Sequence, residues 1–195
     1  MKYIYIMRHG ETLDNLKGIL MGHNDPSLIP EVEEEIVSMR QYVIQPEIVF
    51  SSDLRRALET AQLLFPDREI KALPLFRERY RGEFQGKPTR LWREAVAKSL
   101  SASELECDDD AFAEVGVEPL SSMQSRAVQV MELMKKVKAT NVVVVSHGSF
   151  ITCILKLIQP KSRIHHTLPN LHYHKITLAD DGTVIDVKTN QEWSN

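Results

Sequence analysis

The chain has 195 residues and a formal net charge of -3, with 43% hydrophobic and 26% charged residues. This composition favours one globular domain over residues 1–195, and the charge gives no electrostatic support for a general role on nucleic acids or membrane surfaces. No apolar run approaches the length that spans a bilayer, so we expect a cytoplasmic protein. The two cysteines form no CxxC pair, and we expect no disulfide.

The first part of the chain alternates predicted strands and helices. Apolar runs at residues 2–7 and 47–51 suit strands that are buried on both faces of a parallel sheet, and residues 68–72 form a weaker candidate. Residues 30–43 carry apolar side chains at helical spacing behind a proline, and residues 53–65 form a second helical pattern.

The second part continues this alternation after an interruption. We interpret residues 86–120, which do not fit it, as a helical insertion that ends in an acidic, solvated surface. A helix is predicted at residues 121–137, a valine-rich strand at 141–146 and a helix at 149–158. Residues 174–189 are typical of two strands joined by an Asp-Gly turn.

Together, these elements predict an α/β fold. Alternating strands and helices place helices on both faces of a sheet. We therefore expect a three-layer α/β/α sandwich with a mostly parallel central sheet, an antiparallel edge and a small helical insertion over the active site.

Three predicted strands end in polar residues. The first leads into residues 8–12 (RHGET), the second into residues 51–56 (SSDLRR) and the valine-rich strand into residues 146–149 (SHGS). In open α/β sheets, ligands bind outside the carboxyl ends of the strands, where helix N-termini also point free N–H groups. Two histidines and at least two arginines can therefore converge on one anion.

These residue types suit a phosphoryl group. Arginine supplies donors in a rigid fork, and a neutral imidazole is a nucleophile near pH 7 because its unperturbed pKa is about 6.5. We expect Gly10, beside the nucleophile, to let the backbone approach the anion closely. Taken singly, a histidine after a strand is more often structural, and Arg56 would be an ordinary surface residue. The joint pattern is what indicates phosphoryl chemistry.

The sequence resembles the histidine phosphatase superfamily, the phosphoglycerate mutase-like group. Its motifs occur here in the family's order as "RHGET", "SSDLRRALETA", "FRERYRGEFQG" and "VVVVSHGS", and the match spans nearly the whole chain. A fainter match is "VEPLSSMQSR", in which Glu118 and Arg126 keep the spacing of a family helix start.

The resemblance implies a catalytic set of His9, Arg8, Arg56, His147 and Glu78. His9 would be the nucleophile, and Arg8 and Arg56 would bind the phosphoryl group. His147 would donate a hydrogen bond to that group, and Glu78 would act first as general acid and then as base for the attacking water. No metal or other cofactor is implied.

The expected substrate-binding set adds residues around this centre. Asn15 matches a phosphate-contacting asparagine of the family, and Gly10 and Gly148 follow the two histidines. The sequence departs from the family where Arg81 replaces a common aromatic residue. Two readings of "RERYR" stay open, namely surface charge, or a patch in which Arg79 or Arg81 binds a second anionic group of the substrate.

These observations favour a phosphomonoester hydrolase that acts on a small phosphorylated metabolite through a phosphohistidine intermediate. The alternatives are a cofactor-dependent phosphoglycerate mutase, which the short insertion disfavours, and a catalytically silent phosphate-binding or interaction module. The silent module is disfavoured because binding alone needs neither a nucleophile nor an acid. No residue identifies the substrate among sugar phosphates, phospho-acids, nucleoside phosphates and α-ribazole phosphate, and a homodimer stays open.

Four histidines follow the last predicted helix, at His165, His166, His172 and His174. His172 and His174 would share one face of a strand. We expect a histidine-rich rim or edge strand here in preference to a metal site.

Overall fold

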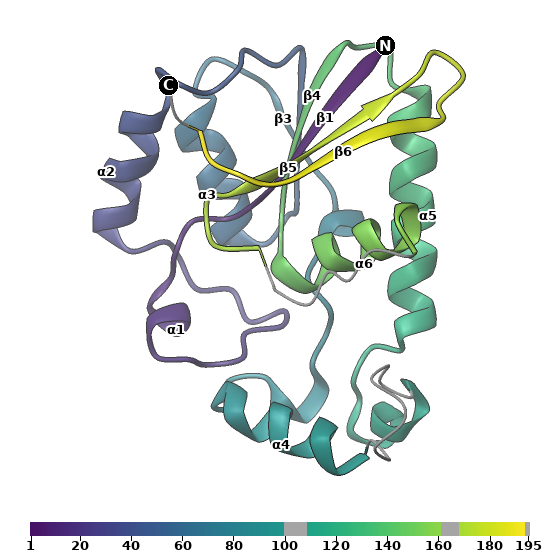
Figure 1. Cartoon of the computed structure of the whole chain (residues 1–195). Helices are drawn as coiled ribbons and strands as arrows, with labels where there is room; N and C mark the ends of the chain where they lie inside the picture. Colours follow the sequence, from purple (N-terminus) through teal and green to yellow (C-terminus); the bar gives the residue numbers. More distant parts are fainter. Residues whose placement is uncertain (100–108, 161–167, 194–195) are drawn as a thin grey trace.

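The computed structural model describes residues 1–99, 109–160 and 168–193, except for the side chains of 99, 109–111 and 190. Within these residues lies a sheet of six strands in the order β3-β2-β4-β1-β5-β6. The strands are β1 (Lys2–Arg8), β2 (Ile48–Ser51), β3 (Ile70–Ala72), β4 (Asn141–Ser146), β5 (Tyr173–Leu178) and β6 (Val184–Gln191). The first four are parallel, and β5 and β6 add the antiparallel edge (Figure 1). This confirms the predicted sheet, including the turn at Gly182.

The described α-helices are α1 (Leu13–Leu16), α2 (Pro30–Met39), α3 (Arg55–Leu64), α4 (Thr89–Ser99), α5 (Leu120–Lys136) and α6 (Gly148–Ile158). Short 3-10 helices occur at η1 (Pro74–Phe76), η2 (Gly82–Phe84) and η3 (Asp109–Val115). Among the described residues, none of these helices has the length and apolar character needed to cross a membrane.

Helices cover both faces of the sheet because β1 and β4 bury apolar side chains on both faces. Ile4 and Ile6 of β1 face a cluster that contains α5 and α6, whereas Tyr5 and Met7 face one that contains α2 and α3. The valines of β4 alternate in the same way. Figure 1 shows α2 and α3 on one side of the sheet and α5 and α6 on the other, which is the expected three-layer sandwich.

Two helices differ from their predicted bounds by more than one residue. The helix predicted at residues 30–43 ends at Met39, and the chain then turns, while Val43 still packs into the same core. The helix predicted at residues 53–65 begins at Arg55, after an extended N-cap residue, and Asp53 instead accepts hydrogen bonds from Nε and Nη2 of Arg77.

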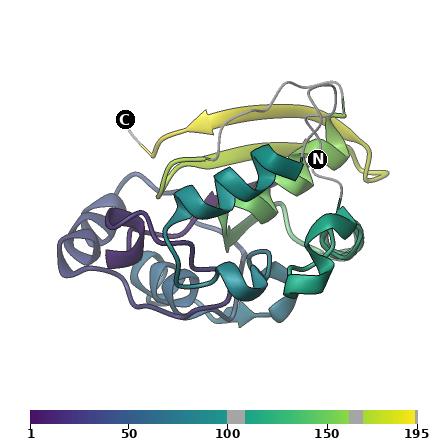
Figure 2. The same cartoon turned by 90° about the horizontal axis from the view of Figure 1, so that it is seen from below.

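The predicted insertion contains α4 and η3, whereas most of its acidic run lies outside the described residues. The ring of Trp92 on α4 packs against Phe84 and Phe112, with centroid distances of 5.2 and 4.9 Å. In Figure 1, α4 lies below both helix layers, near the carboxyl ends of the parallel strands, and Figure 2, seen from that end, shows it in front of α6.

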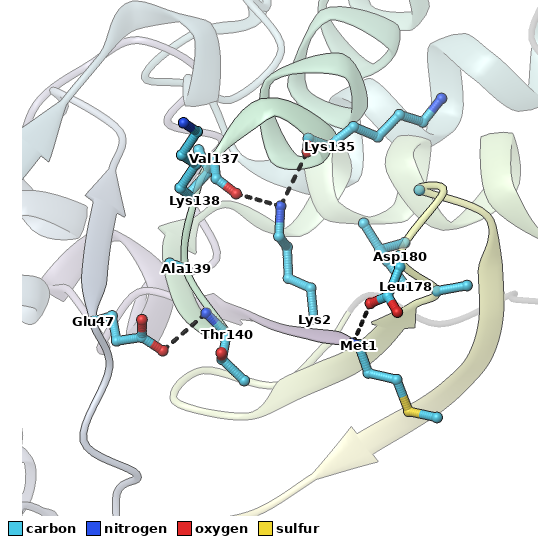
Figure 3. A pocket seen from close by; sticks show the side chains of 12 residues that line it. Met1, Lys2, Glu47, Lys135, Val137, Lys138, Ala139, Thr140, Leu178 and Asp180 are labelled. Carbon is cyan, nitrogen blue, oxygen red and sulfur yellow. Dashed lines mark hydrogen bonds and ion pairs between the residues drawn. The ribbon is translucent and has the colours of Figure 1, made fainter.

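A hollow of about 380 Å³ lies at the opposite, amino end of these strands (Figure 3). There the ammonium group of Lys2 donates hydrogen bonds to the carbonyl oxygens of Met134, Lys135 and Val137 at the end of α5. A cation at this position satisfies carbonyls that lack a partner within the helix and complements the helix dipole. The charge therefore ties β1 to α5.

We expect Lys2→Met to lower the free energy of unfolding by about 1–2 kcal/mol, because it removes charge-assisted hydrogen bonds from the end of α5. Urea denaturation would measure the change. Lys138→Met is the matched control, since Lys138 is exposed and lines the same hollow. Equal stability of the wild type and Lys2→Met would contradict the proposed capping role.

Candidate active site

The pairing of β1 with β4 brings the two histidine motifs together. Arg8 lies opposite Ser146 at the end of the parallel ladder, so His9 and His147 are the next residues of their strands. The backbone N–H of His9 donates to the carbonyl of Ser146 at 3.0 Å. The centroids of the two imidazole rings lie 5.1 Å apart.

A cleft of about 770 Å³ opens at this end of the sheet. Six of the expected site residues line it, namely Arg8, His9, Asn15, Arg56, Glu78 and Gly148. Residues of α4 line its far side, which places the insertion over the site as the sequence predicted. Gly10, Arg79 and His147 do not line this cleft.

Hydrogen bonds at both ring nitrogens orient His9. Its Nδ1 lies 2.6 Å from the carbonyl oxygen of Gly10, which can only accept, so Nδ1 carries the proton. Its Nε2 accepts a hydrogen bond from Nε of Arg56 at 3.2 Å. Burial, and then the charges of Arg56 and Arg8, hold the pKa of His9 well below its usual value. At neutral pH the ring is uncharged and its Nε2 carries a lone pair.

His147 is fully buried, and neither of its ring nitrogens has a hydrogen-bond partner within the described part of the chain. It occupies the N-cap position of α6. Burial, followed by the charge of Arg56, holds its pKa well below the usual value. A buried ring nitrogen without a partner is costly, and a bound ligand can supply that partner.

Backbone carbonyls hold the two arginines in place. Nη1 and Nη2 of Arg56 donate to the carbonyls of Asn24 and Gly22 at 2.7 and 2.9 Å. Burial lowers the pKa of Arg56 to about 10, so it stays charged at neutral pH. Nη1 of Arg8 donates to the carbonyl of Leu168 at 2.8 Å. Both guanidinium groups line the cleft and present positive charge to it.

Packing around position 10 explains why a glycine stands there. A Cβ atom at this position would lie 2.7 Å from Cγ1 of Val32 and 3.1 Å from Cδ2 of Leu28. The missing side chain therefore makes room for the core beside α2, and the expectation that Gly10 also admits the anion stays a prediction. The N–H of Gly10 is also engaged, because it donates to Oγ1 of Thr60 at 2.9 Å.

Asn15 has a local structural function as well as a place in the cleft. Its Oδ1 accepts hydrogen bonds from the backbone N–H and the hydroxyl of Thr12 at 3.1 and 3.0 Å. Thr12 in turn caps α1, which forms a reciprocal capping box. This fixes the orientation of the Asn15 side chain at the cleft.

Backbone N–H groups fix the carboxylate of Glu78. Oε2 accepts from Ser149 in the first turn of α6 at 3.1 Å, and Oε1 accepts from Arg79 at 2.7 Å. Arg126 holds the segment that carries Glu78. It donates to both carboxylate oxygens of Glu118 at 2.9 Å and to the carbonyl oxygen of Arg77 at 2.8 Å. The faint Glu118 and Arg126 motif thus positions the segment that carries Glu78.

Arg79 and Arg81 lie in different surroundings. Nε of Arg79 donates to the backbone carbonyl of Glu118 at 2.8 Å, and its guanidinium lies 5.9 Å from the ring centre of Trp92, but Arg79 does not line the cleft. Arg81 lines the cleft, where its Nη2 donates to Oγ of Ser149 at 2.6 Å and its guanidinium lies 4.9 Å from the ring centre of Trp92. Of the two candidates for a second anion contact, Arg81 has the suitable position.

Sequence reasoning missed two residues beside the site. Nε2 of His23 donates to the carbonyl of Glu78 at 2.8 Å, and its ring meets Tyr80 edge-on. Nδ2 of Asn170 donates to the carbonyl of His9 at 2.8 Å. Both residues lie in irregular segments whose sequence carries no pattern, so only the fold reveals these contacts.

The histidine cluster is only partly described, because His165 and His166 lie outside the described residues. His172 precedes β5 and pairs with Glu192 at 3.0 Å, whereas His174 is buried within β5, where burial lowers its pKa to about 4. In the described ranges, no group of three or more histidine, cysteine or acidic side chains is arranged to hold a metal ion.

The buried histidines predict how stability depends on pH. Unfolding returns His9 and His147 to a pKa near 6.5, so below that pH the unfolded chain binds more protons than the folded one. The free energy of unfolding should therefore fall as the pH is lowered from about 7.5 to about 5.5. Urea denaturation of the wild type and His147→Asn would test this, with a shallower dependence in the variant. Greater wild-type stability at the lower pH would contradict the expectation.

Comparisons with known proteins identify the family of the chain. The model of the histidine phosphatase superfamily (branch 1) matches residues 4–191. A metal-independent phosphoserine phosphatase of Arabidopsis thaliana is 28% identical, over 94% of this chain and 79% of its own. A broad-specificity phosphatase of Saccharomyces cerevisiae is 26% identical, over 85% of this chain and 74% of its own. The crystal structure of a phosphoglycerate mutase from Bacillus anthracis superposes with a TM-score of 0.83 at 23% identity, covering 94% of this chain and 90% of that one. The chain belongs to the histidine phosphatase superfamily, branch 1.

Proposed function

We propose that the protein is a phosphomonoester hydrolase in which His9 is the nucleophile. The observation that carries this proposal is the state of His9 in the cleft: it is uncharged, Nδ1 is bound to the carbonyl of Gly10, and Nε2 accepts from Arg56. A histidine that attacks needs an uncharged ring with its proton on Nδ1, because the lone pair then lies on Nε2. Nε of Arg56 releases this lone pair when phosphorus approaches.

The first step transfers the phosphoryl group to the enzyme. The Nε2 lone pair of His9 forms a bond to phosphorus while the ester P–O bond breaks. Glu78 gives its proton to the leaving oxygen, which departs as an alcohol. Arg8, Arg56 and a ring N–H of His147 stabilise the charge that gathers on the equatorial oxygens. The N-terminus of α6 adds its positive end to the same region.

The second step returns the enzyme to its starting state. Water attacks phosphorus and gives one proton to Glu78, the P–N bond breaks, and its electron pair returns to Nε2. The first step thus releases an alcohol, and the second releases inorganic phosphate. Two backbone N–H groups hold the Glu78 carboxyl in one place, which suits a group that must serve in both steps.

Hydrolysis and mutase action share the first step and differ in the acceptor of the phosphoryl group. The short insertion favours water as the acceptor, and two of the relatives named above are phosphatases. The chain is also similar to phosphoglycerate mutases in both sequence and fold, so the short insertion carries the ranking. We therefore place phosphoryl transfer to a second metabolite behind hydrolysis.

Brief incubation with a labelled phosphomonoester should give an adduct that is acid-labile and base-stable, as a phosphohistidine is, and His9→Ala should give none.

With 3-phosphoglycerate and 2,3-bisphosphoglycerate supplied, release of inorganic phosphate should far exceed exchange between the 2- and 3-isomers. Full activity of His9→Ala would overturn the mechanism, and fast isomer exchange would reverse the order of the two functions.

Charge in the cleft further favours a substrate with a second anionic group. Beyond the arginines that surround His9, the lining includes the cations Lys17, Arg81, Arg90 and Arg93. Among the described residues, Glu78 is the only acidic one that lines the cleft. Such an excess of positive charge attracts and retains polyanions. We propose that Arg81, held between Ser149 and the ring of Trp92, contacts the second anion.

Replacing Arg81 with Met should raise KM for phosphoserine or 3-phosphoglycerate at least about tenfold, the size expected for one charged hydrogen bond, and leave phenyl phosphate nearly unaffected. Arg79→Met is the matched control: Arg79 binds the Glu118 carbonyl, so any effect should be alike for both kinds of substrate. Steady-state kinetics would measure the ratios. An equal loss on both substrates in Arg81→Met would remove the second-anion contact.

A further inference from the structure

Asn170 approaches the nucleophile from a distant part of the chain. Its side-chain Nδ2 donates hydrogen bonds to the carbonyl oxygens of His9 at 2.8 Å and Gly10 at 3.2 Å. The carbonyl of Gly10 is also the acceptor for Nδ1 of His9. One oxygen atom therefore receives hydrogen bonds from both the Asn170 amide and the imidazole ring, which its two lone pairs permit.

The segment around Asn170 is fastened to the end of β1. Nη1 of Arg8 donates to the carbonyl of Leu168 at 2.8 Å, and the backbone of Arg8 exchanges hydrogen bonds with Leu171 and His172, each at 3.1 Å. These contacts place Asn170 beside the loop that follows His9. The position of its amide is therefore set by the same strand that presents the nucleophile.

The backbone beside Asn170 is strained. Leu171 has a φ of 62°. Within the described part of the chain, it is the only residue other than glycine with a positive φ. This conformation is uncommon for a residue with a branched side chain, and it persists only where the surroundings enforce it. Here the Leu171 side chain is buried in the core beside α2 and α3. The core thus holds a turn that directs Asn170 toward His9.

We propose that Asn170 is a positioning residue for His9, which holds the Gly10 carbonyl in the orientation that keeps the proton on Nδ1 and the lone pair on Nε2. This inference rests on the proposed function of His9. An imidazole can place its proton on either nitrogen, and the hydrogen bond at the other one decides which form prevails. If the carbonyl rotates, the ring loses the acceptor that defines its tautomer. The nucleophile then spends less time in the reactive form and points less accurately at phosphorus.

The tautomer can be observed directly. Nitrogen NMR of protein labelled at histidine distinguishes a protonated from an unprotonated ring nitrogen without substrate. In the wild type, Nδ1 of His9 should be protonated and Nε2 unprotonated. In Asn170→Ala and in the isosteric Asn170→Asp, which cannot donate when ionised, the two signals should shift toward a mixture of tautomers. Phosphoenzyme formation from phenyl phosphate in a single turnover should slow about 10–100-fold, with a smaller change in KM.

Leu64→Ala is the matched control. Leu64 is a buried leucine near the end of α3 and packs in the same core as Leu171, but it lies outside the turn that carries Asn170, so Leu64→Ala should lower the thermal midpoint and keep the wild-type tautomer. An unchanged tautomer in both Asn170 variants, or an equal tautomer shift in Leu64→Ala, would overturn the positioning role. If the wild type forms no phosphoenzyme, the proposed function fails. The tautomer measurement still shows whether Asn170 controls the ring.

Discussion

The parallel pairing of β1 with β4 is the constraint on which the site depends. Because Arg8 lies opposite Ser146, the two strands end level with each other and His9 and His147 follow side by side. A shift of one residue would turn every side chain of a strand to the other face of the sheet. The register is strongly specified because the alternating residues of both strands are buried in separate cores. The packing of the two helix layers thus determines where the catalytic chemistry is placed.

Around this pairing, the protein buries charged and polar groups that would otherwise prefer water. Carbonyls of Gly22 and Asn24 bind the guanidinium of Arg56, and the carbonyl of Gly10 binds the ring of His9. These carbonyls belong to the backbone, so their positions change little during a reaction. The same burial that depresses the pKa of both histidines keeps His9 uncharged, as the proposed nucleophile must be. As a consequence, the folded state should lose stability at acidic pH, because both histidines bind protons more readily in the unfolded chain.

The insertion adds a separate surface to this buried centre. Trp92 of α4 packs on Phe84 and Phe112, which anchors the helix over the cleft. The guanidinium of Arg81 lies between α4 and α6, against the ring of Trp92 and the hydroxyl of Ser149. In the proposed mechanism, chemistry at phosphorus and recognition of the remainder of the substrate thus use different elements. Substrate preference can therefore change through α4 while the ends of β1 and β4 stay the same.

Local patterns in the sequence determined most of the fold and the centre of the site. Apolar runs predicted the strands, helical spacing predicted the layers, and the polar residues at the strand ends indicated the phosphate site, since each of these features lies within a few consecutive residues. Contacts between distant segments could not be predicted in this way. The packing reason for Gly10, the separation of Arg79 from Arg81 and the approach of Asn170 to His9 all depend on side chains that meet only after folding. Sequence spacing sets which residues follow a strand, but tertiary packing alone decides which of their atoms come within hydrogen-bonding distance.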